Sequence, residues 1–242
     1  MSFNNCFILV ISFLMISLFS VNAQSVTGTN GLIHIPTAEM FKDKTFIIGA
    51  SLIPKPYFQR FDRRINPGMP TYLNITLFPF MEVMFRYTNE LNMKVNPTTK
   101  YYPDRMMTFR FRVLNEKRSI PSIVLGFQDI TKALGLSCSS CNNYSASYIV
   151  GTKTFTKKSW SLKTSLGYAY DLKDLKSEDF KGLFGGIEVQ NINHANTSLM
   201  AEFNSFHPIV GVQHFFFNKI KIMFGVWDLK KFTTSFNYHI LL

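Results

Sequence analysis

Apolar and polar side chains alternate with a period of two along most of the chain after residue 44. In residues 107–113 every second side chain is apolar, and the intervening positions include Arg110 and Arg112. Successive side chains of a β-strand point to opposite faces, so this period predicts strands with one apolar and one polar face. Such runs predict about twelve strands, at residues 45–54, 71–78, 81–89, 105–114, 121–128, 144–154, 161–170, 183–190, 197–204, 208–215, 219–227 and 231–240.

The segments between the first eight predicted strands alternate between long and short. Outer-membrane barrels show this arrangement, because short turns join their strands on the periplasmic side and longer loops join them outside. Strands of this length also fit a tilted span of the hydrocarbon layer. An unpaired strand edge has no hydrogen-bonding partner in lipid, so the sheet must close. The predicted fold is therefore all-β, a transmembrane antiparallel up-and-down β-barrel of about 12 strands.

The two faces of the predicted strands carry different chemistry. Phe, Leu, Ile, Val and Tyr face the lipid, because a charge at the lipid midplane costs about 2–4 kcal/mol. The alternative is a secreted two-sheet sandwich or a lipocalin-like barrel with its apolar faces inward, which needs a polar outer surface. In the membrane barrel, the charged strand residues point into the interior and form the candidate binding site: Glu82, Arg86, Arg110, Arg112, Lys163, Glu188, Glu202 and Lys221.

These interior charges have two interpretations. Acidic and basic groups could pair and plug a narrow lumen, since unpaired buried charges are costly. Alternatively, the surplus of basic groups could line a path for an anionic polymer or solute. Conductance in planar bilayers distinguishes a plugged lumen from an anion-selective pore.

The N-terminal residues predict export. Residues 1–23 contain no Asp, Glu, Lys or Arg, and their apolar run ends in Asn22 and Ala23. This pattern is typical of a cleaved secretory signal peptide, with an uncleaved N-terminal anchor as the alternative. Residues 24–44 are then a periplasmic or plug segment, and residues 45–242 form the barrel. Gly, Pro and Thr in residues 31–40 predict a turn that tucks this segment toward the periplasmic mouth.

The charge balance narrows the choice of partners. Lys and Arg total 26 against 15 Asp and Glu, a formal net charge of +11. Such a chain suits nucleic acid, anionic lipid or acidic polysaccharide, and the predicted export excludes nucleic acid. We expect outer-membrane lipids as partners, together with an anionic polysaccharide or proteins of an export machinery.

Two cysteines remain after the predicted signal peptide, Cys138 and Cys141. Their spacing lacks the second ligand pair of a structural zinc site, so no metal is expected. In an oxidising compartment we expect a local disulfide, and two free thiols are the alternative.

Catalysis has a weaker basis in the sequence. The chain has no nucleophile elbow, HExxH or P-loop, so we expect no enzymatic activity and no cofactor. Acids and a histidine activate water when they lie within hydrogen-bond reach, which makes a rim hydrolase an alternative function. The residues predicted at the outer strand ends are Asp104, Asp129, Asp171, Asp228 and His207.

Five stretches between residues 28 and 240 carry a family resemblance, at 31–38, 103–105, 116–130, 144–153 and 185–188. In this order they resemble the YjbH family of Gram-negative outer-membrane proteins, which are associated with exopolysaccharide production. The resemblance implies a single-barrel protein of the outer membrane that serves exopolysaccharide production or export as a structural or transport component. A small anion-selective pore is an alternative. The junction around residue 23 also resembles signal sequences common in Bacteroidetes.

Overall fold

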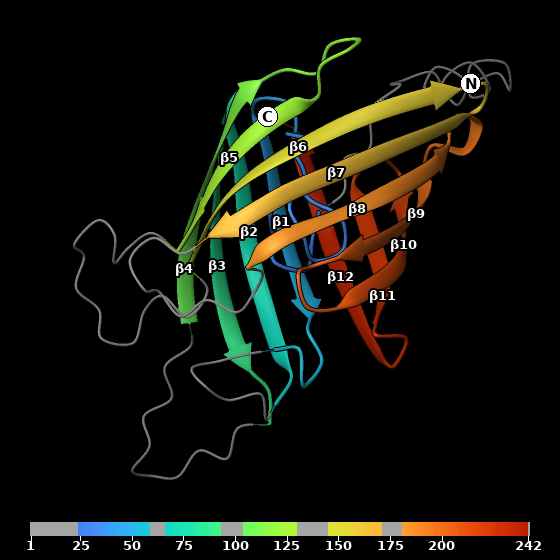
Figure 1. Ribbon diagram of the computed structural model, residues 1–242. Helices are drawn as coiled ribbons and strands as arrows, with labels where there is room; N and C mark the ends of the chain where they lie inside the picture. Colours follow the sequence, from blue (N-terminus) through green and yellow to red (C-terminus); the bar gives the residue numbers. More distant parts are fainter. Residues whose placement is uncertain (1–23, 59–65, 93–103, 130–144, 171–180, 242) are drawn as a thin grey trace, which may run out of the picture.

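The described residues form twelve strands and one short 3-10 helix, η1 (Ile192–His194), which lies between two of the strands (Figure 1). The computed structural model describes residues 24–58, 66–92, 104–129, 145–170 and 181–241. No helix in these ranges has the length and apolar character needed to cross a bilayer. The strands are β1 (Thr45–Leu52), β2 (Gly68–Phe78), β3 (Met81–Glu90), β4 (Asp104–Leu114), β5 (Ser122–Gln128), β6 (Ala146–Lys157), β7 (Trp160–Tyr170), β8 (Gly182–Asn191), β9 (Thr197–Phe203), β10 (Pro208–Phe216), β11 (Ile220–Trp227) and β12 (Lys231–Leu241).

The strands form one closed antiparallel barrel in which each strand pairs with its sequence neighbours. β1 closes the sheet against β12, with Thr45 opposite Leu241 and Leu52 opposite Thr234. Closure removes the free edges that an open sheet would expose. The predicted all-β barrel of twelve strands is confirmed, and the two-sheet sandwich is wrong because a single sheet closes on itself.

Long and short connections lie at opposite ends of the barrel. Residues 53–67, 91–103, 129–145 and 171–181 connect strands at what we call the long-loop end. The opposite, short-turn end carries tighter connections, among them the turn at 158–159 between β6 and β7. The antiparallel order places alternate connections at opposite ends, and their lengths match the alternation predicted from the sequence up to β9. The last two connections at the long-loop end, 204–207 and 228–230, are short.

The barrel has an apolar exterior, and its interior holds the charged strand residues together with apolar ones. Leu166, Leu199 and Phe224 are outward-facing strand residues, and each is at least 58% exposed. On β4, by contrast, the inward-facing Arg110 is only 1% exposed. This is the reverse of a lipocalin-like arrangement, so that alternative is also wrong.

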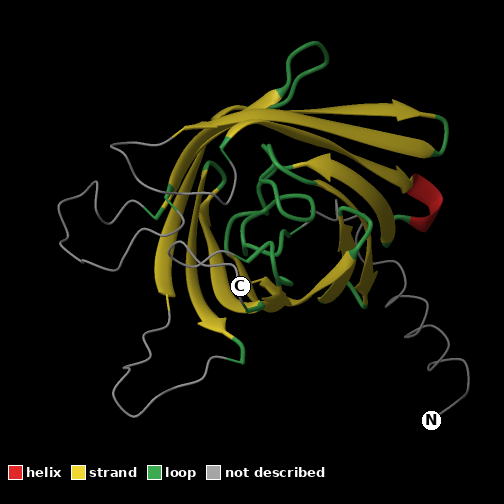
Figure 2. Cartoon of the chain, turned by 60° about the horizontal axis from the view of Figure 1, so that its bottom comes forward, coloured by secondary structure: helices red, strands yellow, loops and turns green. Residues whose placement is uncertain are grey.

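The interior of the barrel is occupied by residues 24–41, which we call the luminal segment. In Figure 2 this part of the chain is the loop inside the ring of strands. Every residue of the luminal segment except Glu39 is buried. Leu32, Ile33 and Ile35 contribute to the apolar core, with exposures of 1% or less. The predicted signal peptide at residues 1–23 lies outside the described residues.

Candidate functional site

The luminal segment is bound to the barrel wall from its first residues onward. The carbonyl oxygen of Gln24 accepts a hydrogen bond of 3.0 Å from Nζ of Lys221, which lies near the short-turn end. The carbonyl of Val26 accepts one of 2.6 Å from the hydroxyl of Ser51, near the long-loop end of β1. The turn expected at the periplasmic mouth lies instead toward the long-loop end, because Ile33, His34 and Ile35 bind Glu202, the next-to-last residue of β9.

Glu202 of β9 binds the middle of the luminal segment. Its carboxylate accepts backbone hydrogen bonds from Ile33 (2.8 Å), His34 (2.7 Å) and Ile35 (3.3 Å). Three consecutive N–H groups that meet one carboxylate make a strong anion site, because hydrogen bonds to a charged acceptor are the strong ones. Glu202 therefore holds the luminal segment itself, and the structure pairs it with backbone donors where the sequence suggested a cation.

Two glycines of the barrel wall, on β10 and β11, leave space for the side chain of Ile33. A Cβ atom at Gly211 or at Gly225 would lie 2.9 Å from side-chain atoms of Ile33. Contacts this short between carbon atoms are repulsive, so a larger residue on β10 or β11 would displace the segment. The absence of side chains at these two positions makes room for Ile33.

Arg110 and Glu82 bind the C-terminal part of the luminal segment, residues 37–41. Its guanidinium forms an ion pair with Glu82 of β3 and donates hydrogen bonds to the carbonyl oxygens of Thr37 and Glu39. Glu82 in turn accepts a hydrogen bond of 2.9 Å from the backbone N–H of Phe41. A single buried ion pair thus binds both carbonyl and amide groups of the segment, which satisfies charges that would be costly if left alone.

A second charged cluster includes the one partly exposed residue of the segment. The carboxylate of Glu39 lies 2.8 Å from Nζ of Lys163, and Glu188 lies 3.6 Å from the same nitrogen. The amide of Gln213 donates to Glu188 at 2.8 Å. This network joins β7, β8 and β10 to the luminal segment.

Seven of the eight predicted interior residues are less than 9% exposed, and five of them are placed above in contact with the luminal segment. Glu188 reaches the segment only through the shared Lys163, and Arg86 is 3% exposed with partners of its own. Arg112 differs from the other seven because it lies at the short-turn end of β4 and is only partly buried. Its guanidinium contacts the carbonyl of Pro79 and the side chain of Asn115, each at 3.4 Å. The structure thus gathers most of the predicted site around the luminal segment.

The rim at the long-loop end holds a second cluster. Asp228 accepts a hydrogen bond of 2.8 Å from the hydroxyl of Tyr57 and lies 2.9 Å from Nδ1 of His207. Tyr57 stacks on Trp227, with ring centroids 4.8 Å apart. Burial and the bond to Asp228 raise the pKa of Tyr57 to about 12.

Only part of the predicted rim site comes together. Asp228 and His207 meet, whereas Asp104 is buried on the distant strand β4 and Asp129 is buried just after β5, and Asp171 lies outside the described residues. Within the described ranges no Ser, Thr or Cys hydroxyl or thiol bonds to His207. Tyr57 was not predicted, because its connection carries no periodic signal.

No metal centre is evident in the part of the chain that the structure describes, where no three His, Cys, Asp or Glu side chains cluster. Cys138 and Cys141 lie outside the described residues. Their disulfide stays a prediction. If it forms, the purified protein has no reactive thiol until a reducing agent is added. Two thiols that label freely in the native protein would refute the bridge.

Two of the solved structures similar to this chain are outer membrane phospholipases. Outer membrane phospholipase A from Escherichia coli matches with 10% identity and a TM-score of 0.37, over 83% of this chain and 92% of that one. The calcium-bound outer membrane phospholipase dimer from Salmonella typhi matches with 10% identity and a TM-score of 0.36, over 83% and 90%. No curated protein sequence matches significantly. The family model of YjbH, described as exopolysaccharide biosynthesis protein YbjH, matches residues 23–216, and the chain therefore belongs to the YjbH family.

Proposed function

We propose that this protein is an outer-membrane component of exopolysaccharide production, acting without enzymatic activity and with a lumen closed by its own luminal segment. Family membership supports the association with exopolysaccharide. The exterior of the barrel supports the membrane location, and the contacts inside the lumen support the closed state. Partners in this role are lipids of the outer membrane and either an anionic polysaccharide or proteins that export one.

The exterior has the features of a surface in contact with lipid. Among outward-facing positions of the described strands, charge occurs only near the barrel ends, at Arg105, Lys153 and Lys157. Exposed aromatic side chains lie near both ends, for example Trp160 at the short-turn end and Tyr170 at the long-loop end. Apolar bands flanked by aromatic girdles are typical of outer-membrane barrels. In that class, the long-loop end faces outside the cell.

The observation that carries the closed state is the set of contacts between the buried wall charges and the luminal segment. Glu202 binds three of its N–H groups, and Arg110 binds two of its carbonyl groups. Because the backbone groups of the luminal segment form hydrogen bonds with these charged side chains, the side chains are not available to bind a solute in the lumen. The protein then serves as a structural component in this state, and transport requires the segment to move.

Three measurements test the proposal. The protein should fractionate with the outer membrane, and the detergent-purified barrel should migrate differently on gels before and after heating. A strain that lacks the gene should produce less exopolysaccharide, and the wild-type gene should restore the amount. Normal exopolysaccharide in the deletion strain, or recovery of the protein in the soluble fraction, contradicts the proposal.

A small anion-selective pore is the second candidate, favoured by the net charge of +11 and by the basic groups inside the barrel. Planar bilayers separate the two candidates. The closed-lumen proposal expects wild-type protein to show little current and a variant with residues 26–40 replaced by a short Gly-Ser linker to conduct. Steady anion-selective current through the wild-type protein favours the pore. Heat-modifiable gel mobility of the variant verifies that its barrel has folded.

A further inference from the structure

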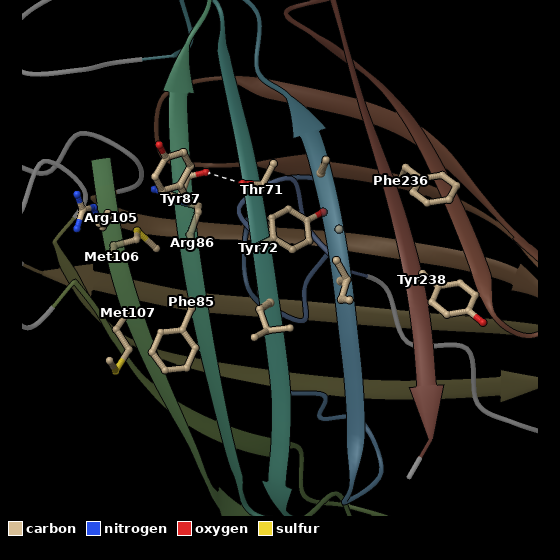
Figure 3. Close-up of a pocket in the computed structure, with 14 residues that line it drawn as sticks. Thr71, Tyr72, Phe85, Arg86, Tyr87, Arg105, Met106, Met107, Phe236 and Tyr238 are labelled. Atoms are coloured by element: carbon tan, nitrogen blue, oxygen red, sulfur yellow. Dashed lines mark hydrogen bonds between the residues drawn. The ribbon is translucent and has the colours of Figure 1, made fainter. Parts of the chain in front are cut away.

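The outer wall of the barrel contains a large apolar hollow over β12, β1, β2, β3 and β4. Its volume is about 830 Å³, within the range of roughly 300–1,000 Å³ that is usual for ligand sites. Figure 3 shows Phe236 and Tyr238 on one side of it and Phe85, Tyr87 and Arg105 on the other. We call this feature the outer hollow.

The strand register explains why the wall is concave there. One row of paired, outward-facing residues runs across five strands in the order Phe236, Ala50, Thr71, Tyr87 and Arg105. Ala50 and Thr71 are small, whereas Phe236, Tyr87 and Arg105 on either side of them are large. The missing side-chain volume at Ala50 and Thr71 therefore forms the floor of the outer hollow between aromatic walls.

The next row toward the short-turn end extends the outer hollow along the strands. It consists of Tyr238, Ile48, Leu73, Phe85 and Met107. All five side chains are largely apolar, and an apolar hollow does not retain water. If it stayed empty, its lining would lose dispersion contacts. In a bilayer, a hydrocarbon chain is the group that fills such a space.

Arg105 places a positive charge at the edge of the outer hollow that is nearest to the long-loop end. It is the second residue of β4, at the long-loop end, and its side chain is exposed. Among the described residues no carboxylate forms an ion pair with Arg105. A guanidinium matches the geometry of a phosphate group, to which it can donate two parallel hydrogen bonds. An apolar hollow below an available guanidinium is complementary to a phosphorylated lipid.

We propose that the outer hollow binds one acyl chain of a phosphorylated glycolipid of the outer leaflet, the lipid A class, with its phosphate on Arg105. This inference rests on the proposed membrane location, in which the long-loop end faces outside. Phosphorylated glycolipid is the lipid that makes up the outer leaflet of such a membrane, and its phosphate lies at the depth of the upper strand ends. The hydrocarbon contacts hold the chain, and the phosphate contact selects the headgroup.

Native mass spectrometry of the full-length, delipidated protein tests the site with diphosphoryl lipid A as the probe. Ala50→Phe fills the floor of the outer hollow, and Arg105→Gln removes the charge. Each should lower lipid A retention about tenfold, as expected for the loss of one charge-assisted contact or of the space for the chain. Dephosphorylated lipid A should bind wild-type protein as weakly as diphosphoryl lipid A binds Arg105→Gln.

Two control variants carry matching changes away from the outer hollow. Ala201→Phe adds an aromatic ring to the outward face of β9, and Lys230→Gln removes an exposed charge at the long-loop end. Both should retain lipid A like the wild-type protein. Equal retention by Ala50→Phe, or a preference for phosphatidylglycerol, overturns the inference while leaving the membrane location intact. Failure of every form to bind any lipid, with the protein in the soluble fraction, overturns the proposed function as well.

Discussion

Replacing Glu202 by Ala should release the luminal segment from the barrel wall. The substitution removes the acceptor of three backbone hydrogen bonds, from Ile33, His34 and Ile35, two of which are 2.8 Å or shorter. Glu202 is only 5% exposed, so water does not readily replace the lost acceptor. The N–H groups would be left buried without a partner, which is the costly outcome for a hydrogen-bonding group.

The expected size of the effect follows from these contacts. A hydrogen bond to a charged group contributes about 1.5–3 kcal/mol, so the two short bonds alone contribute at least about 3 kcal/mol. This free energy corresponds to a shift of about 100-fold in the equilibrium between the bound and the released segment. Glu202→Gln keeps one acceptor oxygen and should give a smaller shift, of about tenfold.

Hydrogen exchange of the folded barrel in detergent measures this equilibrium at individual backbone amides. The backbone amides of residues 33–35 should exchange about 100-fold faster in Glu202→Ala, because the luminal segment is released from the wall more often and its amides then meet solvent. Glu116→Gln is the matched control, because Glu116 also accepts from a backbone N–H, that of Thr154 at 2.9 Å, but at the short-turn end. Unchanged protection at residues 33–35 in Glu202→Ala would refute the assignment of Glu202 as the anchor.

Two further predictions concern the wall and the rim. Gly126→Ala should lower the free energy of unfolding by about 1–3 kcal/mol, because the new Cβ would overlap the ring of Tyr148. Gly151→Ala should be tolerated in the same thermal or denaturant assay, because its Cβ would lie 3.7 Å from the carbonyl oxygen of Ser122, an ordinary contact distance. At the rim, ultraviolet titration should detect a tyrosine with a pKa of about 12, and Asp228→Asn should lower it. Because the folded pKa of Tyr57 lies above 10.0, its stabilising contribution is complete below pH 10 and is lost as the pH rises toward 12; a pH-independent stability over that window would contradict the bond.

Parts of the candidate site were not predictable from the sequence because they depend on contacts between distant residues. Glu202 lies 167 to 169 positions from the three amides that it binds, and Tyr57 lies 171 positions from Asp228. The alternating pattern places the side chain of Glu202 inside the barrel. It does not distinguish a cation, water or a backbone amide as the partner, since each would leave the same pattern.

The sequence by itself determined the strands and the two faces of the sheet. These features are local, because a period of two assigns each side chain to a face and the cost of a charge in lipid assigns the charged face to the interior. Tertiary structure alone decided which groups meet within the closed barrel. The path of residues 24–41 through the lumen, and the outer hollow formed where Ala50 and Thr71 come side by side, both depend on strand register and closure. Register brings together residues from separate strands, and no local pattern along the chain encodes that pairing.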